Sequence, residues 1–304
     1  MNLMIKSEKN DLFCLAHTLE GHNSAVYSIA ICKEFIYSAS ADKQIARWNI
    51  KTGEIDNFSI KVEAVPYTIK TIPKYNLLII GLTNGKVYVI DILEKKEITC
   101  LIGHSAAIFS IESNLESEQL YFGDKEGGLS AWSIVTWEKL FSFDLNCGKI
   151  RDLKYIPNQH LLLLAKYNGD IGIYETNFFN EIKTFEAHTN GVSALCFDET
   201  KQRVISGGKD AHITSFDLEG NKIQSVPAHN YVVYGIDRFN AKLSLSCSRD
   251  GSIKIWNAEF SKVLQKIEYK NIGHKHSVNQ MIVINAEYFA SCSDDRKIKI
   301  YKLK

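Results

Sequence analysis

Residues 242–256 read KLSLSCSRDGSIKIW, and this stretch contains the pattern that decides the fold. Polar and apolar residues alternate before and after a tight-turn sequence at 249–252. Alternation with a period of two on both sides of a Gly- and Asp-containing turn predicts two antiparallel strands. Similar runs at 232–236 and 262–267 extend the unit to four short strands. No part of the unit has the spacing of a helix.

The same unit recurs seven times along the 304 residues. Each unit closes on an aromatic or apolar residue, at intervals of 42, 42, 42, 42, 40 and 45: Trp48, Ile90, Trp132, Tyr174, Phe216, Trp256 and Tyr301. Six residues earlier stands a turn-forming or acidic residue: Asp42, Asn84, Glu126, Asn168, Asp210, Asp250 and Asp295. A repeat of this length cannot bury its apolar faces alone, so the units must stack on their neighbours.

Five of the seven units open on a dipeptide that ends in histidine. Gly-His stands at 21–22, 103–104 and 273–274, and Ala-His at 187–188 and 228–229. The closing residue follows each of these histidines after 26 to 28 residues. These openers and their spacing resemble those of the WD-repeat β-propeller family. No unit ends in Trp-Asp, and units two and four lack the opening histidine. The resemblance therefore rests on the number and period of the units, and it covers residues 12–304.

This resemblance implies an all-β fold, a seven-bladed β-propeller of four-stranded antiparallel blades in a single domain at 12–304. Residues 1–11 are expected to form an N-terminal tail. The last unit supplies only three strands before the chain ends at Lys304, and a strand-like run at 12–18 precedes the first opener. We expect this run to complete the last blade as its outer strand, since closure removes exposed sheet edges.

Two units contain a complete set of four polar and aromatic residues: His22, Ser38, Asp42 and Trp48, and His229, Ser246, Asp250 and Trp256. The family resemblance implies a buried network in which Asp accepts from His, and Ser bonds both His and the indole N–H. A Ser-His-Asp hydrolase is the alternative. The repetition of the set and the absence of a Gly-x-Ser-x-Gly elbow favour the structural role.

The network is expected to weaken in the other units. Units five and seven keep His, Ser and Asp but close on Phe216 and Tyr301. Unit three has His104, Glu126 and Trp132 with a Phe at the serine position, so its network is predicted to be incomplete. Units two and four have Ile80 and Leu164 there, which predicts apolar packing instead.

Composition excludes several classes of function. Apolar residues are 45%, charged residues 23% and the formal charge is +1, so no basic field indicates DNA binding. No apolar run could span a membrane and no secretion signal is apparent. The seven cysteines are odd in number and lack Cys-x-x-Cys spacing. They predict reduced thiols in a cytoplasmic protein without a zinc site, and no motif predicts another metal or a cofactor.

Two sets of positions are expected at the top face around the channel, by analogy with WD-repeat proteins. The first, 15 to 17 residues before each turn residue, holds Tyr27, Tyr67, Phe109, Arg151, Ser193, Tyr234 and Asn279. The second precedes each turn residue and is basic or aromatic in blades three to six. Together with Lys149 they predict an aromatic arc beside a basic arc. The candidate partner-binding residues are Tyr27, Tyr67, Phe109, Lys125, Lys149, Arg151, Tyr167, Lys209, Tyr234 and Arg249.

The leading hypothesis is a non-enzymatic scaffold or adaptor that binds a protein or peptide with acidic and apolar anchors. It would act either as a monomer or as a subunit of a larger complex. A hydrolase-like propeller enzyme is one alternative, although the expected channel mouth offers one acid, Asp294, and no His. Recognition of RNA or a modified peptide tail by the aromatic residues is another alternative.

Overall fold

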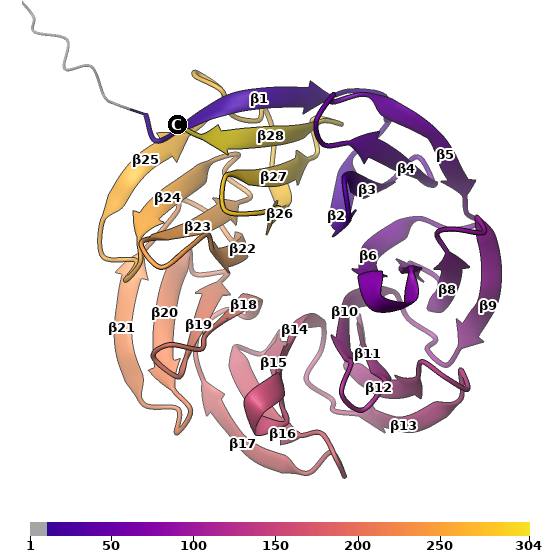
Figure 1. The fold of residues 1–304 in the computed structure, drawn as a ribbon. Helices are drawn as coiled ribbons and strands as arrows, with labels where there is room; N and C mark the ends of the chain where they lie inside the picture. Colours follow the sequence, from indigo (N-terminus) through magenta and orange to yellow (C-terminus); the bar gives the residue numbers. More distant parts are fainter. Residues whose placement is uncertain (1–10) are drawn as a thin grey trace, which may run out of the picture.

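A ring of seven four-stranded antiparallel sheets surrounds a central channel in the computed structural model, which describes residues 11–304 (Figure 1). Each sheet is one blade, so the predicted all-β, seven-bladed propeller is confirmed. Within residues 11–304 the helical segments are two single 3-10 turns, η1 (Pro73–Tyr75) and η2 (Pro157–Gln159). The predicted tail lies outside the described residues except for Asp11.

The four strands of each blade run from the channel to the rim. The innermost strands are β2 (Val26–Cys32), β6 (Pro66–Ile72), β10 (Ile108–Asn114), β14 (Ile150–Ile156), β18 (Val192–Asp198), β22 (Val233–Arg238) and β26 (Val278–Val283). The second strands are β3 (Phe35–Ser40), β7 (Leu77–Leu82), β11 (Gln119–Asp124), β15 (Leu161–Lys166), β19 (Arg203–Gly208), β23 (Leu243–Ser248) and β27 (Tyr288–Ser293). The third strands are β4 (Gln44–Asn49), β8 (Lys86–Asp91), β12 (Gly128–Ser133), β16 (Asp170–Glu175), β20 (His212–Asp217), β24 (Ile253–Asn257) and β28 (Ile298–Leu303). The outer strands are β5 (Ile55–Lys61), β9 (Lys96–Ile102), β13 (Lys139–Asp144), β17 (Glu181–Glu186), β21 (Lys222–Pro227), β25 (Val263–Ile267) and β1 (Phe13–Leu19).

The turn between the second and third strands explains the recurring turn residue. In every blade the residue that follows it has a positive φ, which glycine adopts without strain. Four blades place Gly there, as at Gly251 with φ of 80°. The other three place Lys43, Ala211 and Arg296 there, with φ of 66°, 66° and 70°.

The apolar core is divided into seven clusters, and each cluster lies between two neighbouring blades. Between blades one and two, for example, Tyr37 and Ala39 of β3 pack with Leu78 and Ile80 of β7, and all four are buried. Burial of one such aliphatic side chain contributes about 1.5–3 kcal/mol. Because each cluster needs both blades, stability depends on the ring being complete.

The ring closes through the N-terminal strand, as predicted. Strand β1 pairs antiparallel with β28, with Phe13 opposite Leu303 and Leu19 opposite Ile298. The Gln265 side chain of blade six accepts a hydrogen bond from the Phe13 backbone N–H at 2.8 Å and donates one to its carbonyl at 3.1 Å. The fully buried Phe13 ring packs edge-on against Phe289, with ring centroids 5.0 Å apart. Figure 1 shows β1 and β28 side by side at the junction.

Candidate interaction site at the channel mouth

Blade one contains the complete four-residue network. His22 Nδ1 lies 2.9 Å from Asp42 Oδ2, and its Nε2 lies 2.7 Å from Ser38 Oγ. The Trp48 indole N–H donates to the same Ser38 oxygen over 2.8 Å. Ser38 is fully buried, so the network satisfies polar groups that water cannot reach.

Blade six repeats this arrangement. His229 contacts Ser246 Oγ at 2.8 Å and Asp250 at 3.2 Å, and the Trp256 indole donates to Ser246 at 2.8 Å. Burial lowers the pKa of His229, which favours the neutral imidazole. Burial acts to raise the pKa of Asp250, but hydrogen bonds from His229, Ser252 and a backbone amide hold it well below its ordinary value. An ionised, fully bonded Asp beside a neutral His is a stable structural pair.

Blade three has the network as well, so the prediction that it is incomplete was wrong. His104 Nδ1 lies 2.7 Å from Asp124 Oδ2, and Nε2 lies 2.6 Å from Ser130 Oγ, which also accepts from the Trp132 indole at 2.9 Å. Asp124 replaces the predicted Glu126, which is exposed. Ser130 lies on the third strand, two residues before Trp132. The same atoms therefore meet although their sequence positions have shifted.

The remaining blades differ from one another. Blade five joins His188 to Asp210 and Ser206, at 2.9 Å each, without an indole donor. The same three residue types meet in blade seven, at His274, Ser291 and Asp295. Blades two and four have fully buried Ile80 and Leu164 at the serine position. Blade four adds a polar contact that was not predicted, from the buried Lys166 ammonium to Thr184 Oγ1 at 2.9 Å.

These networks do not have the features of a hydrolase site. A nucleophilic serine must reach substrate and needs an oxyanion hole nearby. Ser38, Ser246 and Ser206 are each fully buried, and their histidines are fixed between Asp and Ser. The arrangement recurs in blade after blade, which is expected of a structural device. The networks join the loops at one face of the ring to the strands beneath.

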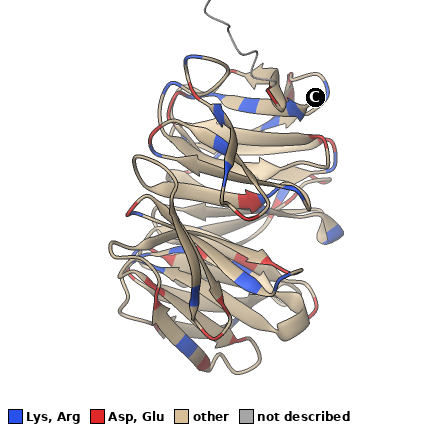
Figure 2. Ribbon diagram, turned by 90° about the vertical axis from the view of Figure 1, so that its left-hand side faces the viewer, with Lys and Arg blue, Asp and Glu red and all other residues tan. Residues whose placement is uncertain are grey.

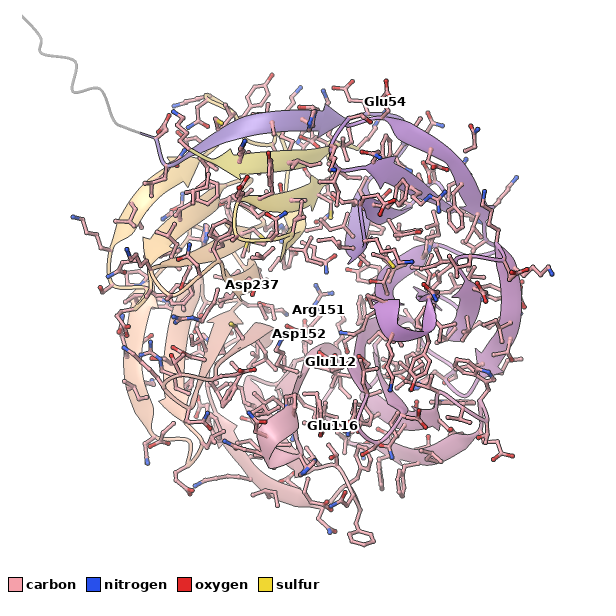
Figure 3. All side chains as sticks on the ribbon, in the orientation of Figure 1. Glu54, Glu112, Glu116, Arg151, Asp152 and Asp237 are labelled. Atoms are coloured by element: carbon pink, nitrogen blue, oxygen red, sulfur yellow. The ribbon has the colours of Figure 1, made fainter. Side chains whose placement is uncertain are left out.

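The channel mouth is the site at which the predicted surface residues meet. We use this name for the second residues of the seven innermost strands: Tyr27, Tyr67, Phe109, Arg151, Ser193, Tyr234 and Asn279. All seven line one cavity of about 350 Å³ in the channel. Figure 3 shows Arg151 in the central opening. The two short turns η1 and η2 follow the far ends of innermost strands and so lie on the opposite face.

Three aromatic rings form a continuous wall on one side of the channel mouth. The Tyr27 and Tyr67 ring centroids are 5.0 Å apart, and the Tyr67 and Phe109 centroids are 4.4 Å apart with ring planes at 89°. The Tyr67 and Phe109 rings meet edge to face, an arrangement in which aromatic rings attract each other. All three side chains are half-buried, so part of each ring remains accessible to a ligand.

Arg151 joins this wall to the opposite side of the channel. Its Nη1 donates to the Tyr67 hydroxyl at 3.1 Å. Its Cζ lies 4.9 Å from the Phe109 ring centroid and 5.6 Å from that of Tyr234, in blade six. Cations are attracted to ring faces at such distances. The sequence predicted an aromatic arc beside a basic arc, whereas the structure interleaves the two kinds of side chain.

A second group of candidates gathers around Tyr167. The Lys209 ammonium lies 3.4 Å from the Tyr167 ring centroid, and the Lys149 ammonium lies 5.2 Å from it and 5.6 Å from that of Phe109. Lys209 lowers the pKa of the Tyr167 hydroxyl by hydrogen bonding and by its charge. Lys149 therefore connects this group to the wall of aromatic rings.

The last two candidates lie at the edge of the site. Lys125 is exposed beside a shallow groove that Tyr67 and Phe109 also line, and its ammonium lies 3.7 Å from Glu126. Arg249 is exposed. Burial raises the pKa of the Tyr234 hydroxyl, and the charges of Arg151 and Arg249 act against this shift.

A layer of charged side chains below the channel mouth was missed by the sequence analysis. Lys70 pairs with Glu112 at 2.6 Å, and Lys154 and Asp237 belong to the same level of the innermost strands. Figure 3 shows Glu112, Asp152 and Asp237 around the channel. The signal was available, since Lys70, Glu112, Lys154 and Asp237 each stand three residues after a residue of the channel mouth.

Asp152 belongs to neither layer, because its Oδ2 accepts the Leu195 backbone N–H of the next blade at 2.8 Å. Burial raises the pKa of Asp152 to about 6, although this hydrogen bond and the charge of Lys154 act to lower it.

Across residues 11–304, no three His, Cys, Asp or Glu side chains are placed to hold a metal ion. No helix of this range is long and apolar enough to cross a membrane.

Comparison with known proteins agrees with this geometry. The family model described as "WD domain, G-beta repeat" matches residues 13–49, 179–217, 220–257 and 265–302, which together make up half of the chain. The chain therefore belongs to the WD-repeat family.

Several curated proteins are similar to this chain. A "Striatin homolog" of Dictyostelium discoideum is 23% identical over 93% of this chain and 34% of its own length. "Nuclear distribution protein nudF 1" of Talaromyces marneffei is 32% identical over 54% of this chain and 36% of its own. A "WD repeat-containing protein 55 homolog" of D. discoideum is 24% identical over 74% of this chain and 55% of its own. The chain thus spans between a third and about half of these relatives.

Proposed function

We propose that this protein is a non-enzymatic interaction scaffold that binds a segment of a partner protein at the channel mouth. WD-repeat propellers are generally scaffolds of this kind, without catalysis. The observation that carries the proposal is the convergence of Tyr27, Tyr67, Phe109, Arg151 and Tyr234 on one cavity. Tyr and Arg are among the residues that most often dominate the energy of an interface. The accessible rings and the positive charge fit a segment with apolar and acidic anchors.

The alternative functions have weaker support. An enzyme would need a reactive group at the channel mouth, but the His-Asp-Ser sets belong to the structural networks, and Ser193 at the mouth donates to the Gly207 and Val233 carbonyls. An RNA-binding surface would need a dominant basic field. The formal charge is +1, and Figure 2 shows basic and acidic residues interspersed along the side of the ring. A tail carrying a methylated cation would meet rings that already hold Arg151.

The proposal includes a cytoplasmic location and leaves the protein either a monomer or a subunit of a complex. The location is supported by the seven cysteines, all of which are free thiols. Proteins of oxidising compartments commonly pair such residues. Membrane and DNA contacts are not part of the proposal.

Selection from a random peptide display library on the immobilised protein tests the proposed site. Affinities of the selected peptides are then measured by calorimetry for the wild type and for Tyr27→Ala and Arg151→Ala. Lys74→Ala is the matched control, since the exposed Lys74 ammonium lies 4.9 Å from the Tyr75 ring on the opposite face. We expect at least tenfold weaker binding in the first two variants and no change in the control. Full affinity in both folded variants would refute the proposed site.

A further inference from the structure

Arg151 differs from the other arginines that are not fully exposed. Arg47, Arg203 and Arg238 each pair with a carboxylate, at 2.9, 2.7 and 2.8 Å. Within residues 11–304, Arg151 has no carboxylate within 4 Å. A buried charge is usually paired with an opposite charge, and a guanidinium suits a carboxylate. Among the described residues, Arg151 is the one arginine short of full exposure that lacks such a partner, and it stands at the channel mouth.

The free donors of Arg151 are available to a ligand. Nη1 donates to the Tyr67 hydroxyl at 3.1 Å. Among the described residues, Nε and Nη2 have no hydrogen-bond partner, and neither atom is sealed from solvent. The adjacent Asp152 does not pair with the guanidinium; its Oδ1 and Oδ2 instead accept the backbone N–H groups of Leu153 and Leu195. One edge of the guanidinium therefore remains open.

The charges around Arg151 are unevenly distributed. Lys149 and Lys209, from the loop before β14 and the turn after β19, approach Tyr167 and have no carboxylate within 4 Å among residues 11–304. On the blade-seven side, the exposed Asp294 accepts a hydrogen bond from Asn279 Nδ2 at 2.8 Å. The cations nearest to Arg151 therefore lie over blades four and five, whereas the charged group bonded to the blade-seven residue of the mouth is a carboxylate. Such a field attracts an anion to Arg151 and repels a cation from it.

Resting on the proposed function, we infer that the docked segment inserts one Asp or Glu side chain whose carboxylate binds the open edge of Arg151. The planar guanidinium fork matches a carboxylate, which takes two parallel N–H donors. A phosphate dianion would need several converging cations, whereas Lys149 and Lys209 are directed to the Tyr167 ring. The segment places apolar neighbours of the acid on Tyr27 and Tyr67. Its acidic end lies over blades four and five, away from Asp294.

A double-mutant cycle tests this pairing with the selected peptides described above. Each Asp or Glu of a peptide is changed in turn to Asn or Gln, and affinities are measured for the wild type and for Arg151→Gln. We expect one acid-to-amide change to weaken wild-type binding at least tenfold and to have less than a twofold effect on Arg151→Gln. Arg151→Lys keeps the charge without the fork, so it should bind the unchanged peptide with intermediate affinity. A circular dichroism melt checks that each variant is folded.

Three results would overturn the inference while leaving the proposed function intact. The first is peptide binding that requires Tyr27 but does not change with any acid-to-amide substitution. The second is selection of Lys- or Arg-rich peptides that bind Arg151→Gln more tightly, which would mean that the rings receive a cation. The third is a tenfold gain on replacing the acid by phosphoserine, which would make phosphate the ligand. Binding that survives both Tyr27→Ala and Arg151→Ala would instead refute the proposed function.

Discussion

Replacement of His229 by Ala should destabilise the ring more than any change at Asn146, the residue at the opener position of blade four. The His229 side chain is completely inaccessible to solvent. It contacts Ser246 at 2.8 Å, Ser252 at 3.1 Å and Asp250 at 3.2 Å. Removing the imidazole breaks these contacts and leaves a cavity. By contrast, Asn146 is exposed.

The magnitude follows from the lost contacts. A net hydrogen bond contributes about 1 kcal/mol and one to a charged group about 1.5–3 kcal/mol. The cavity adds to this loss, but Ser246 keeps its Trp256 donor and Asp250 keeps backbone donors. We therefore expect His229→Ala to cost about 3 kcal/mol. Asn146→Ala should cost about 1 kcal/mol, because Ala is strained at the left-handed φ of 47°.

The assay is urea denaturation followed by both circular dichroism and tryptophan fluorescence, because coincident curves indicate two-state unfolding. Burial lowers the pKa of His229 below its ordinary 6.5, so as the pH falls the unfolded chain takes up a proton on this residue more readily than the folded ring does. The stabilisation by neutral His229 is therefore present above about pH 6.5 and declines below it. The difference in free energy of unfolding between the wild type and His229→Ala should therefore become smaller as the pH falls from 7.5 to 5.5. Equal losses in His229→Ala and Asn146→Ala would refute the argument.

Three further predictions concern closure, the channel and a turn. Deletion of residues 1–19 removes β1 and should cause cooperative loss of the folded ring, whereas an unchanged melting temperature would contradict closure by this strand. Burial raises the pKa of Asp152 from 3.8 to about 6, so the folded protein loses stability as the pH rises between these values. The free energy of unfolding of Asp152→Asn should therefore increase relative to the wild type by up to about 3 kcal/mol from pH 4 to pH 7. Parallel plots of stability against pH for the two proteins would exclude this. Ala211→Gly should raise stability by about 0.5–1 kcal/mol in urea denaturation, because φ is 66° at this turn, and a loss would show that the turn is not strained.

The fold was predictable because the information that specifies it is local and repeated. Alternation defines each strand, and the turn residue of each unit is followed by a residue with a positive φ. The number of units defines the ring, and the missing fourth strand of the last unit indicates how it closes. None of these inferences needs knowledge of which distant side chains touch.

The network of blade three was mispredicted because hydrogen bonding depends on where atoms lie and not on aligned positions. Asp124, two residues before the aligned Glu126, brings its carboxylate to His104 at 2.7 Å. Ser130 on β12 reaches both His104 and Trp132, the role that Ser38 on β3 has in blade one. Neighbouring strands bring both positions close to the same histidine, so sequence alignment alone could not select between them.

The contacts at the channel mouth could not be read from the sequence for a different reason. Arg151 and Tyr67 are 84 residues apart and belong to different blades, and the Tyr234 ring approaches from a third. The repeat predicts that such residues share a level of the channel. It does not predict which side chain crosses the opening or which rings it contacts.

The channel mouth is also the place where binding free energy is available. Elsewhere in residues 11–304, Arg47, Arg203 and Arg238 pair with carboxylates, and buried histidines bond to Asp and Ser. Arg151 is held by Tyr67, Phe109 and Tyr234, so its orientation is fixed before a partner arrives, yet its charge is not neutralised. A ligand carboxylate would gain a charge-assisted pair while immobilising few additional rotamers on the protein side. Arg151→Gln, which should weaken peptide binding, should leave the stability of the free ring nearly unchanged, and this difference separates a binding role of Arg151 from a structural one.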